Sequence, residues 1–511
     1  MKKTMIFLAV AMATVFTFSS CQKEYIESNV SESGIRVITA EFENNATKTT
    51  LNSDGKTPEW AVGDVIRVLS SSTYKDITLV SGSGTPEEGQ GIIANNAIVI
   101  TIPAAMTGTL YAVYPASATT MTSCNDGNIN FTIPAIKDGT FASANICVAK
   151  SSTTDGTNKD NLVFRNATAV LKIKTAADVV GVDITATNSI AGPVTASFSG
   201  TELSLTTTSL DKSSVSAVGT SAPSDGVFYL ATAPVTATGS TATCYKIDKK
   251  GSINKDNKEL VRNVIYSMNL SSMTINTDCD LTGTKGVLNG HEYVIIKAKY
   301  GGTNDSYLKW ATTNLGASNP QDYGDLYSWG ETSPKSDYSK SKYSSTAEAI
   351  SSDISPTSVY DAARVNWGGS WRMPTKDEFV ALAANCVWFW TFNYNSTGKS
   401  GYIVYVAKRD FDKGKVNMNG TWKKWVGSSY SSCSEATDTY DVTDPHMFFP
   451  ATGESSGTSN TYVGSSGNYW SSSFAKYYTT LACRLYFTSS NVNPQGTSHR
   501  SNGHSVRPVS D

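Results

Sequence analysis

The sequence predicts a chain that is mainly β in its N-terminal half and α+β in its C-terminal half. Its 511 residues are too many for one ordinary core and indicate two to four domains. From residue 35 to about 275, short alternating strands follow polar turns, and no convincing amphipathic helix interrupts them. Beyond residue 300 the composition changes, because Trp60 is the only earlier tryptophan and the other nine lie between Trp310 and Trp470.

The N-terminus has the pattern of an export signal. Met1-Lys2-Lys3 is basic, residues 5–18 are apolar but too few to span a bilayer with ease, and Ser19-Ser20 precede Cys21. Small residues directly before a cysteine resemble the lipobox of bacterial lipoproteins, in which the thiol is acylated, for example with palmitate. We therefore expect residues 1–21 to be a lipoprotein signal peptide and Cys21 to be the lipidation site. The alternative is an ordinary cleaved signal in which the cysteine is incidental.

The next segment, residues 22–34, is polar and is expected to be a flexible leader. Its first residues, Gln22-Lys23-Glu24, resemble the charged tags that send such lipoproteins to the outer surface. The expected location is the cell outer membrane, with the chain held at the cell surface by its lipid anchor and without a spanning helix.

Strands then follow one another, and we expect antiparallel sandwiches. In the stretch from Ile35 to Glu43, alternation places Ile38, Ala40 and Phe42 on one face. A later strand places Ala169, Leu171 and Ile173 on one face, with Lys172 and Lys174 on the other. We place a first β-unit at 35–175 and a second at 176–275.

This half resembles the fimbrillin family of bacterial surface pilins. The residues that carry the resemblance are the Thr47-Lys-Thr49 and Trp60-x-x-Gly-Asp64 pairing, Tyr111–Pro115, Ile129–Pro134, Ala149-Lys150, Leu162–Asn166 with Ala169–Lys174, and Arg262–Tyr266. The resemblance implies two transthyretin-like β-sandwiches, proteolytic removal of an N-terminal strand, and insertion of a neighbouring subunit's strand into the groove. Arg36, just ahead of the first strand, is then the candidate proteolytic processing site. The alternative is a charged residue at a strand edge.

A polar linker is expected at 276–288, and the last domain at 289–511. Alternation resumes from Glu292 to Tyr300, with Val294, Ile296, Ala298 and Tyr300 on one face. A short helix is expected around Pro356–Arg364.

A second helix follows, because Thr375 can cap it and Glu378, three residues on, can complete a capping box. Phe379, Leu382, Ala383 and Cys386 form its apolar stripe. Directly before it, Trp367 and Trp371 bracket a Gly-Gly turn.

The last domain resembles the Fibrobacter succinogenes major paralogous domain. Six ordered motifs carry the resemblance: Asn289–Val294, Lys309–Ala317, Tyr323–Thr332, Trp367–Thr375, Tyr469–Ser472 and Ser505–Val509. The resemblance implies a C-type lectin-like fold, similar also to the formylglycine-generating enzymes, but no established activity. It further implies that Trp310, Trp329, Trp367, Trp371 and Trp470 fill the core.

Several function classes lose support. Lys plus Arg is 42 against 44 for Asp plus Glu without a long basic run, so no nucleic-acid partner is expected. The seven cysteines after Cys21 form no zinc pattern, and a Cys386–Cys483 or Cys386–Cys433 disulfide stays open. Cys386 and Cys483 are expected to be buried small hydrophobes.

Other motifs also favour structural explanations. No helix pattern follows Gly453–Gly457, so its G-x-S-x-G spacing favours a Ser/Gly loop over a nucleophile elbow. Asn493-Pro494-Gln495 lacks the further oxygen ligands that calcium needs, and His499 with His504 is expected to lie in a solvated loop. We predict no enzyme, no cofactor and no metal.

Trp422 and Trp425, with Lys423 and Lys424 in a polar insertion, are the candidate ligand contacts. The function expected is that of a cell-surface lipoprotein acting as a minor or tip fimbrial subunit or adhesin. Its partners would be the outer membrane, other pilin subunits, and a glycan or host surface protein. The alternatives are a non-fimbrial glycan-binding lipoprotein and, with less support, an enzyme of the formylglycine-generating type.

Overall fold

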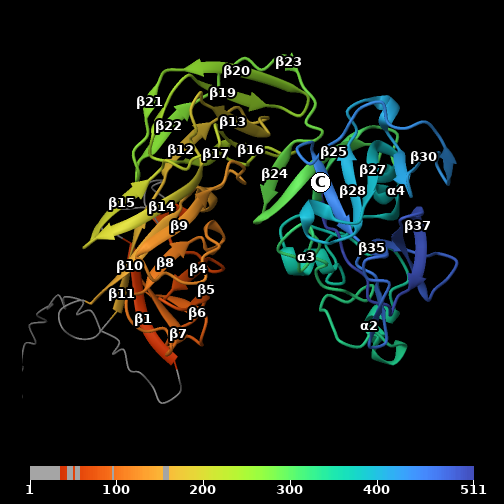
Figure 1. Ribbon diagram of the computed structural model, residues 1–511, viewed down its shortest axis with the longest axis horizontal. Coiled ribbons are helices and arrows are strands. Elements are labelled where there is room, and N and C mark those ends of the chain that lie inside the picture. Colours follow the sequence, from red (N-terminus) through yellow and green to blue (C-terminus); the bar gives the residue numbers. More distant parts are fainter. Residues whose placement is uncertain (1–34, 43–49, 52–57, 95–96, 154–159) are drawn as a thin grey trace, which may run out of the picture.

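The computed structural model describes residues 35–42, 50–51, 58–94, 97–153 and 160–511. The predictions for the signal peptide, Cys21 and the leader lie outside these residues. The chain is mainly β, as expected, and most of its helical elements, including α2, α3 and α4, lie in the C-terminal half (Figure 1). Within the described ranges, no helix is both long and apolar enough to cross a membrane.

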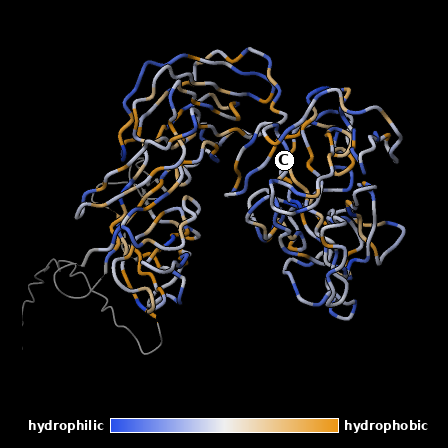
Figure 2. The backbone as a smooth tube through the Cα atoms, in the orientation of Figure 1, coloured by the Kyte–Doolittle hydropathy of each residue, from blue (hydrophilic) through white to orange (hydrophobic). Residues whose placement is uncertain are grey.

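The first unit is a sheet that closes on itself in the order β1-β11-β10-β8-β4-β5-β6-β7. Figure 2 shows apolar residues gathered along these strands. Its elements are β1 (Ile35–Phe42), β2 (Thr50–Leu51), β3 (Pro58–Glu59), β4 (Val65–Leu69), β5 (Tyr74–Val80), β6 (Gln90–Ala94), β7 (Ala97–Pro103), β8 (Tyr111–Tyr114), η1 (Ala116–Ala118), β10 (Cys147–Thr153) and β11 (Asp160–Asn166).

Strand β1 completes this sheet. It pairs antiparallel with β7 on one side and parallel with β11 on the other. The predicted inward face is confirmed, because Ile38, Ala40 and Phe42 are all buried. Phe42 stacks on Trp60 with ring centroids 4.2 Å apart, and Trp60 meets Phe164 of β11 edge-on at 5.4 Å. The first strand therefore supplies part of the core of its unit.

The second unit is a set of smaller sheets, ordered β17-β12-β22, β16-β13-β19-β20-β23, β15-β14-β9 and β18-β21. Its elements are β9 (Asn128–Ile133), α1 (Phe141–Ala144), β12 (Ala169–Lys174), β13 (Gly181–Thr185), β14 (Gly192–Ser199), β15 (Glu202–Thr206), β16 (Ser214–Val218), β17 (Val227–Thr232), β18 (Thr236–Ala237), β19 (Ser240–Tyr245), β20 (Lys249–Lys255), β21 (Lys258–Glu259), β22 (Ile265–Asn269) and β23 (Thr277–Asp278).

The two units exchange strands. Strand β12 falls within the first unit predicted at 35–175, but it pairs with β17 and β22 of the second. Strand β9 precedes β10 in the chain, yet it pairs with β14. One apolar cluster accordingly contains Val113 and Val148 from the first unit together with Ile173 and Leu230.

The C-terminal half contains both helices and strands. Its helical elements are η2 (Lys340–Lys342), α2 (Ser345–Glu348), α3 (Ala362–Trp367), α4 (Lys376–Asn385), η3 (Tyr394–Ser396) and η4 (Asp410–Asp412). Its strands are β24 (Lys285–Leu288), β25 (His291–Ala298), β26 (Ser306–Ala311), β27 (Cys386–Thr391), β28 (Gly401–Val406), β29 (Lys415–Met418), β30 (Thr421–Trp425), β31 (Tyr430–Ser432), β32 (His446–Pro450), β33 (Glu454–Ser456), β34 (Ser459–Thr461), β35 (Ser466–Phe474), β36 (Leu481–Thr488), β37 (Asn491–His499) and β38 (Val509–Ser510).

These strands form sheets in the orders β24-β25-β26-β38, β31-β30-β29-β27-β28-β32, β33-β34 and β35-β36-β37. The last strand, β38, pairs with β26 near the start of this half, so the two ends of the region lie side by side. Trp310, Trp329, Trp371 and Trp470 are buried, as expected for core residues. Trp367 is half-buried and stacks on His291.

The predicted capping box of α4 is present. The Glu378 N–H donates to Thr375 Oγ1 at 3.2 Å, and the Thr375 N–H donates to Glu378 Oε2 at 2.7 Å. The Arg372 guanidinium donates two hydrogen bonds to the same carboxylate, at 2.6 and 2.9 Å, and one to the Asp511 carboxylate at 2.7 Å. The preceding helix, α3, begins later than expected because Asp361 is its N-cap and accepts the Arg364 N–H.

The second unit packs directly against the C-terminal half. Val180 and Val218 from the second unit share an apolar cluster with Tyr293, Ile295 and Trp371. The Tyr293 hydroxyl donates to the Val218 carbonyl at 2.6 Å. Alternation predicted one buried face for β25, but both faces are buried, because the second unit covers the face that carries Ile295. We name this contact the seam.

The segment between the halves is short. Strand β23 pairs with β20 of the second unit, and β24 pairs with β25 of the C-terminal half. This leaves residues 279–284 between the two strands, and Leu281 in that stretch is buried in the seam. The connection is therefore packed at one point, which favours a fixed relation between the second unit and the C-terminal half.

We expect the C-terminal half to lose stability as pH falls. The His291 ring stacks on Trp367 at 3.6 Å, and burial lowers its pKa to about 4. In the unfolded chain a histidine titrates near pH 6.5, so between about pH 6.5 and 4 only the unfolded state gains the proton. The contribution of the neutral His291 ring to stability is therefore fully present above pH 6.5 and is lost as the pH falls toward 4. Urea unfolding, monitored by tryptophan fluorescence, gives a midpoint at pH 7 and another at pH 4.5. The difference between the two midpoints should be smaller for His291→Phe, which keeps the ring stack, than for the wild type. An equal pH dependence would contradict this assignment.

Candidate ligand-binding site

The two predicted contact tryptophans lie on opposite faces of β30, which lies between β29 and β31. Trp425 is only 7% exposed and packs on Tyr430, its partner in the ladder, with ring centroids 5.0 Å apart. The expectation that Trp425 is exposed is therefore wrong. Trp422 points to the other face and is half-buried against the cluster that contains Val387, Ile403 and Phe448. Of the pair, only Trp422 keeps ring surface for a ligand.

Arg36 lies within β1 and not ahead of it. Its guanidinium donates to the Met106 carbonyl at 2.6 Å, and burial lowers its pKa. Cleavage after Arg36 would leave Val37 to Phe42 in the sheet, so a cut at this bond would not by itself release β1. Processing at Arg36 stays a prediction.

The motifs considered for catalysis have structural surroundings. Ser455 is buried in β33, which turns into β34 and not into a helix. Cys386 and Cys483 are free and buried, and burial raises the pKa of Cys386 to about 12. Such a thiol is a poor nucleophile.

Neither disulfide left open by the sequence is formed, since Cys433 is also free. In the described part of the chain, no three His, Cys, Asp or Glu side chains are grouped to hold a metal. His504 is buried against Trp470, at a ring separation of 4.3 Å, so the solvated loop expected for it is wrong.

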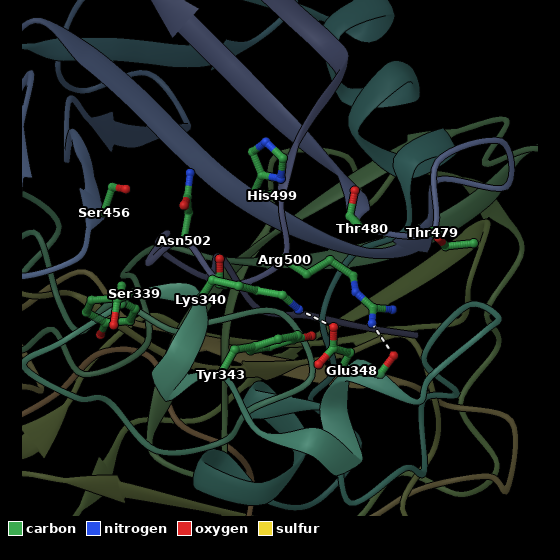
Figure 3. Close-up of a pocket in the computed structure, with 12 residues that line it drawn as sticks. Ser339, Lys340, Tyr343, Glu348, Ser456, Thr479, Thr480, His499, Arg500 and Asn502 are labelled. Carbon is green, nitrogen blue, oxygen red and sulfur yellow. Dashed lines mark hydrogen bonds and ion pairs between the residues drawn. The ribbon is translucent and has the colours of Figure 1, made fainter.

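The candidate site is a pocket of about 420 Å³ in the C-terminal half (Figure 3). Four distant stretches of chain line it: 338–348, Ser456, 479–480 and 499–502. Backbone hydrogen bonds join these stretches, from Tyr338 N to Gly457 O at 2.7 Å and from Arg500 N to Thr480 O at 3.1 Å. The pocket is therefore built on paired backbone and not on free loops.

Two tyrosine rings supply the apolar part of the pocket. Tyr338 and Tyr343 are both buried. The Tyr338 hydroxyl donates to the Leu326 carbonyl at 2.5 Å, and the Tyr343 hydroxyl donates to the Trp329 carbonyl at 2.7 Å. Since both hydroxyls are used inside the protein, these residues offer ring surface to the pocket.

Arg500 is a buried cation in the pocket wall. It is 3% exposed, and its guanidinium lies 5.2 Å from the centroid of the Trp329 ring. It donates to the Ile350 carbonyl at 2.6 Å and to the Glu348 carbonyl. Its Nε has no acceptor, and no carboxylate among the described residues forms an ion pair with it. The positive charge of Arg500 is thus stabilised by backbone carbonyl dipoles and by aromatic ring faces.

The rim of the pocket is polar. Lys340 forms an ion pair with Glu348, and the pKa of Glu348 is lowered by this hydrogen bond and by the charges of Lys340 and Arg500. Thr480 and His499 are exposed, and Asn502 is half-buried (Figure 3). The arrangement combines an aromatic surface, a ring of hydroxyl, amide and imidazole groups, and a net positive charge. Such an arrangement can bind a small polar ligand.

Most of this site carries no signal in the sequence. Its segments are separated by up to about 160 residues, and only the pairing of strands brings them together. Of its lining residues, the sequence pattern singled out only His499, and it favoured a solvated loop there.

No protein-family model matches the chain, and no curated protein sequence matches it. Among solved structures it is similar to a proposed cell adhesion protein of Bacteroides uniformis, at 14% identity and TM-score 0.29 over 48% of this chain and 98% of that one. A proposed cell adhesion protein of Bacteroides ovatus gives 13% identity and TM-score 0.30 over 48% and 95% of the two chains. A fimbrial protein of Bacteroides ovatus gives 11% identity and TM-score 0.23 over 92% and 98%. Scores this low assign no function to the chain.

Proposed function

We propose that the chain is a cell-surface adhesin of the fimbrial type, acting as a minor or tip subunit. Its N-terminal half would be two transthyretin-like units that join it to a fibre. Its C-terminal half would be a C-type lectin-like domain that binds the target. The observation that carries the proposal is the position of β1 between β7 and β11.

Removal of β1 would open a groove along the first unit. The edges of β7 and β11 would lose their partners, and the space left by Ile38, Ala40 and Phe42 would expose the core. Such a groove, with unpaired N–H and C=O groups on both sides, accepts a strand from another chain. This supports assembly by strand exchange.

The C-terminal half favours an end position in the fibre. Strand β38 pairs with β26, Arg372 binds Asp511, and Lys309 donates to the Asp511 carbonyl. A strand held in this way is not free to be donated to the next subunit. The juxtaposition of β38 with β26, the short helices and the long loops also support the lectin-like assignment.

An enzyme of the formylglycine-generating type gains no support. Such an enzyme would need a reactive thiol, and burial raises the pKa of both Cys386 and Cys483. We therefore propose a binding function without catalysis.

Two experiments test this function. Immunogold labelling of native surface fibres with antibodies to the C-terminal half should mark fibre ends. Label along the whole fibre would contradict the end position. Fibres without label, on cells that carry the protein, would favour the non-fimbrial lipoprotein.

For the anchor, growth with a labelled fatty acid should mark the protein and leave Cys21→Ala unlabelled.

A further inference from the structure

We propose that the Tyr343–Arg500 pocket binds a carboxylate-bearing saccharide unit. This ligand class rests on the proposed adhesin function and deepens it. It follows from three features of the pocket: its charge, its aromatic surface and its polar rim. Its volume of about 420 Å³ lies within the range of small-ligand pockets.

The charge of the pocket favours an anion. Lys340 and Glu348 pair with each other, so their charges largely cancel. Arg500 adds a positive charge. It forms no ion pair with a described carboxylate, and it feels only the field of the Glu348 carboxylate, which already pairs with Lys340. A buried guanidinium is weakly screened by solvent and is usually matched by a carboxylate or phosphate. A carboxylate on the ligand would supply the missing counter-charge.

The aromatic surface favours a ring. Tyr338 and Tyr343 line the pocket and turn their hydroxyls inward, so they contribute ring carbon and not hydroxyl groups to its wall. One face of a pyranose ring carries mainly C–H groups and packs well on such a surface. Lys340 lies near the same ring, with Nζ 5.4 Å from the centroid of Tyr343, so the positive charge is adjacent to the ring face.

The rim matches the hydroxyl groups of a sugar. Ser456, Thr480, His499 and Asn502 each carry a group that can donate or accept a hydrogen bond. Ser456, Thr480 and His499 make no side-chain hydrogen bond to other described residues. An acidic peptide would use the charge but few of these groups, so the saccharide fits more of the pocket.

The test uses the full chain on an array of uronate- and sialate-terminated saccharides printed beside their methyl esters and neutral counterparts. We expect retention by carboxylate forms at least tenfold above the matched esters. Equal binding of the esters, or no saccharide binding, would overturn the proposal. Competition by a tetraglutamate peptide at equal concentration would also overturn it, in favour of an acidic peptide.

Variants locate the binding in this pocket. Lys340→Glu should weaken retention at least tenfold, whereas Lys258→Glu, the same charge change on an exposed strand of the second unit, should not. Tyr343→Phe keeps the ring and should bind as the wild type does, and Tyr343→Leu should not. Unchanged binding by Lys340→Glu would overturn the assignment. If cells still adhere and fibre ends still label while acidic saccharides fail to bind, the ligand class is wrong and the adhesin function stands.

Discussion

Replacing Arg372 with methionine is expected to lower the free energy of unfolding of the C-terminal half by about 3 to 5 kcal/mol. The Arg372 and Glu378 side chains are each only 7% exposed, so the change leaves a buried carboxylate without its cation. The same carboxylate completes the capping box of α4, and Arg372 also ties in Asp511 beside β38. One substitution therefore disturbs the helix start and the last strand together.

Urea unfolding followed by tryptophan fluorescence measures this effect well, because nine of the ten tryptophans lie in the C-terminal half. Lys413→Met is the matched control. It removes a cation whose partner, Asp410, is 94% exposed, so the midpoint should hardly move. Adding Glu378→Gln to Arg372→Met should recover part of the loss, because glutamine is neutral and can still reach the Thr375 N–H. A midpoint for Arg372→Met equal to that of the control would contradict the role of this ion pair.

The start of α4 shows what local sequence can predict. Thr375 and Glu378 are three residues apart, and their mutual hydrogen bonds need only the geometry of one helical turn. The bond from Arg372 to Asp511 spans 139 residues and depends on the pairing of β26 with β38. No pattern within a short window contains that information.

Strand β25 shows why alternation gave an incomplete account. The face with Val294 and Ile296 is buried in the C-terminal core, as predicted. Ile295 points the other way and is buried as well, because the second unit covers that face. A strand that is covered on both sides has a continuous apolar sequence. The sequence of the strand does not indicate which part of the chain covers its second face.

The candidate contacts show the same limit. Trp422 and Trp425 are separated by two polar residues, and the polar insertion predicted exposure for both. Pairing with β31 buries Trp425 on Tyr430, while the actual pocket contains no tryptophan in its lining. The exposure of a side chain on a strand depends on which neighbouring strands pair with it, and the local sequence does not determine those neighbours.

Replacing Ala40 with arginine is expected to displace β1 and open the first unit. Ala40 is fully buried, and its register partners are Ile98 on β7 and Leu162 on β11. A guanidinium at this point has no acid partner and no room, so keeping β1 in place would cost more than about 4 kcal/mol. The rest of the unit keeps its remaining strands, so a groove with two free edges should result.

A labelled peptide with the sequence of Ile35 to Phe42 should then bind the Ala40→Arg variant and not the wild type, whose own β1 fills the groove. Fluorescence anisotropy measures this binding directly. Val37→Arg is the control, because Val37 lies on the half-buried outer face of the same strand and its replacement should leave β1 in place. Loss of all structure in the first unit of Ala40→Arg, seen as loss of protection in hydrogen exchange from β4 to β8, would show that β1 is an integral strand. Strand exchange in the first unit would then have no physical basis, since a groove can accept a donor only if the remaining strands hold their places without β1.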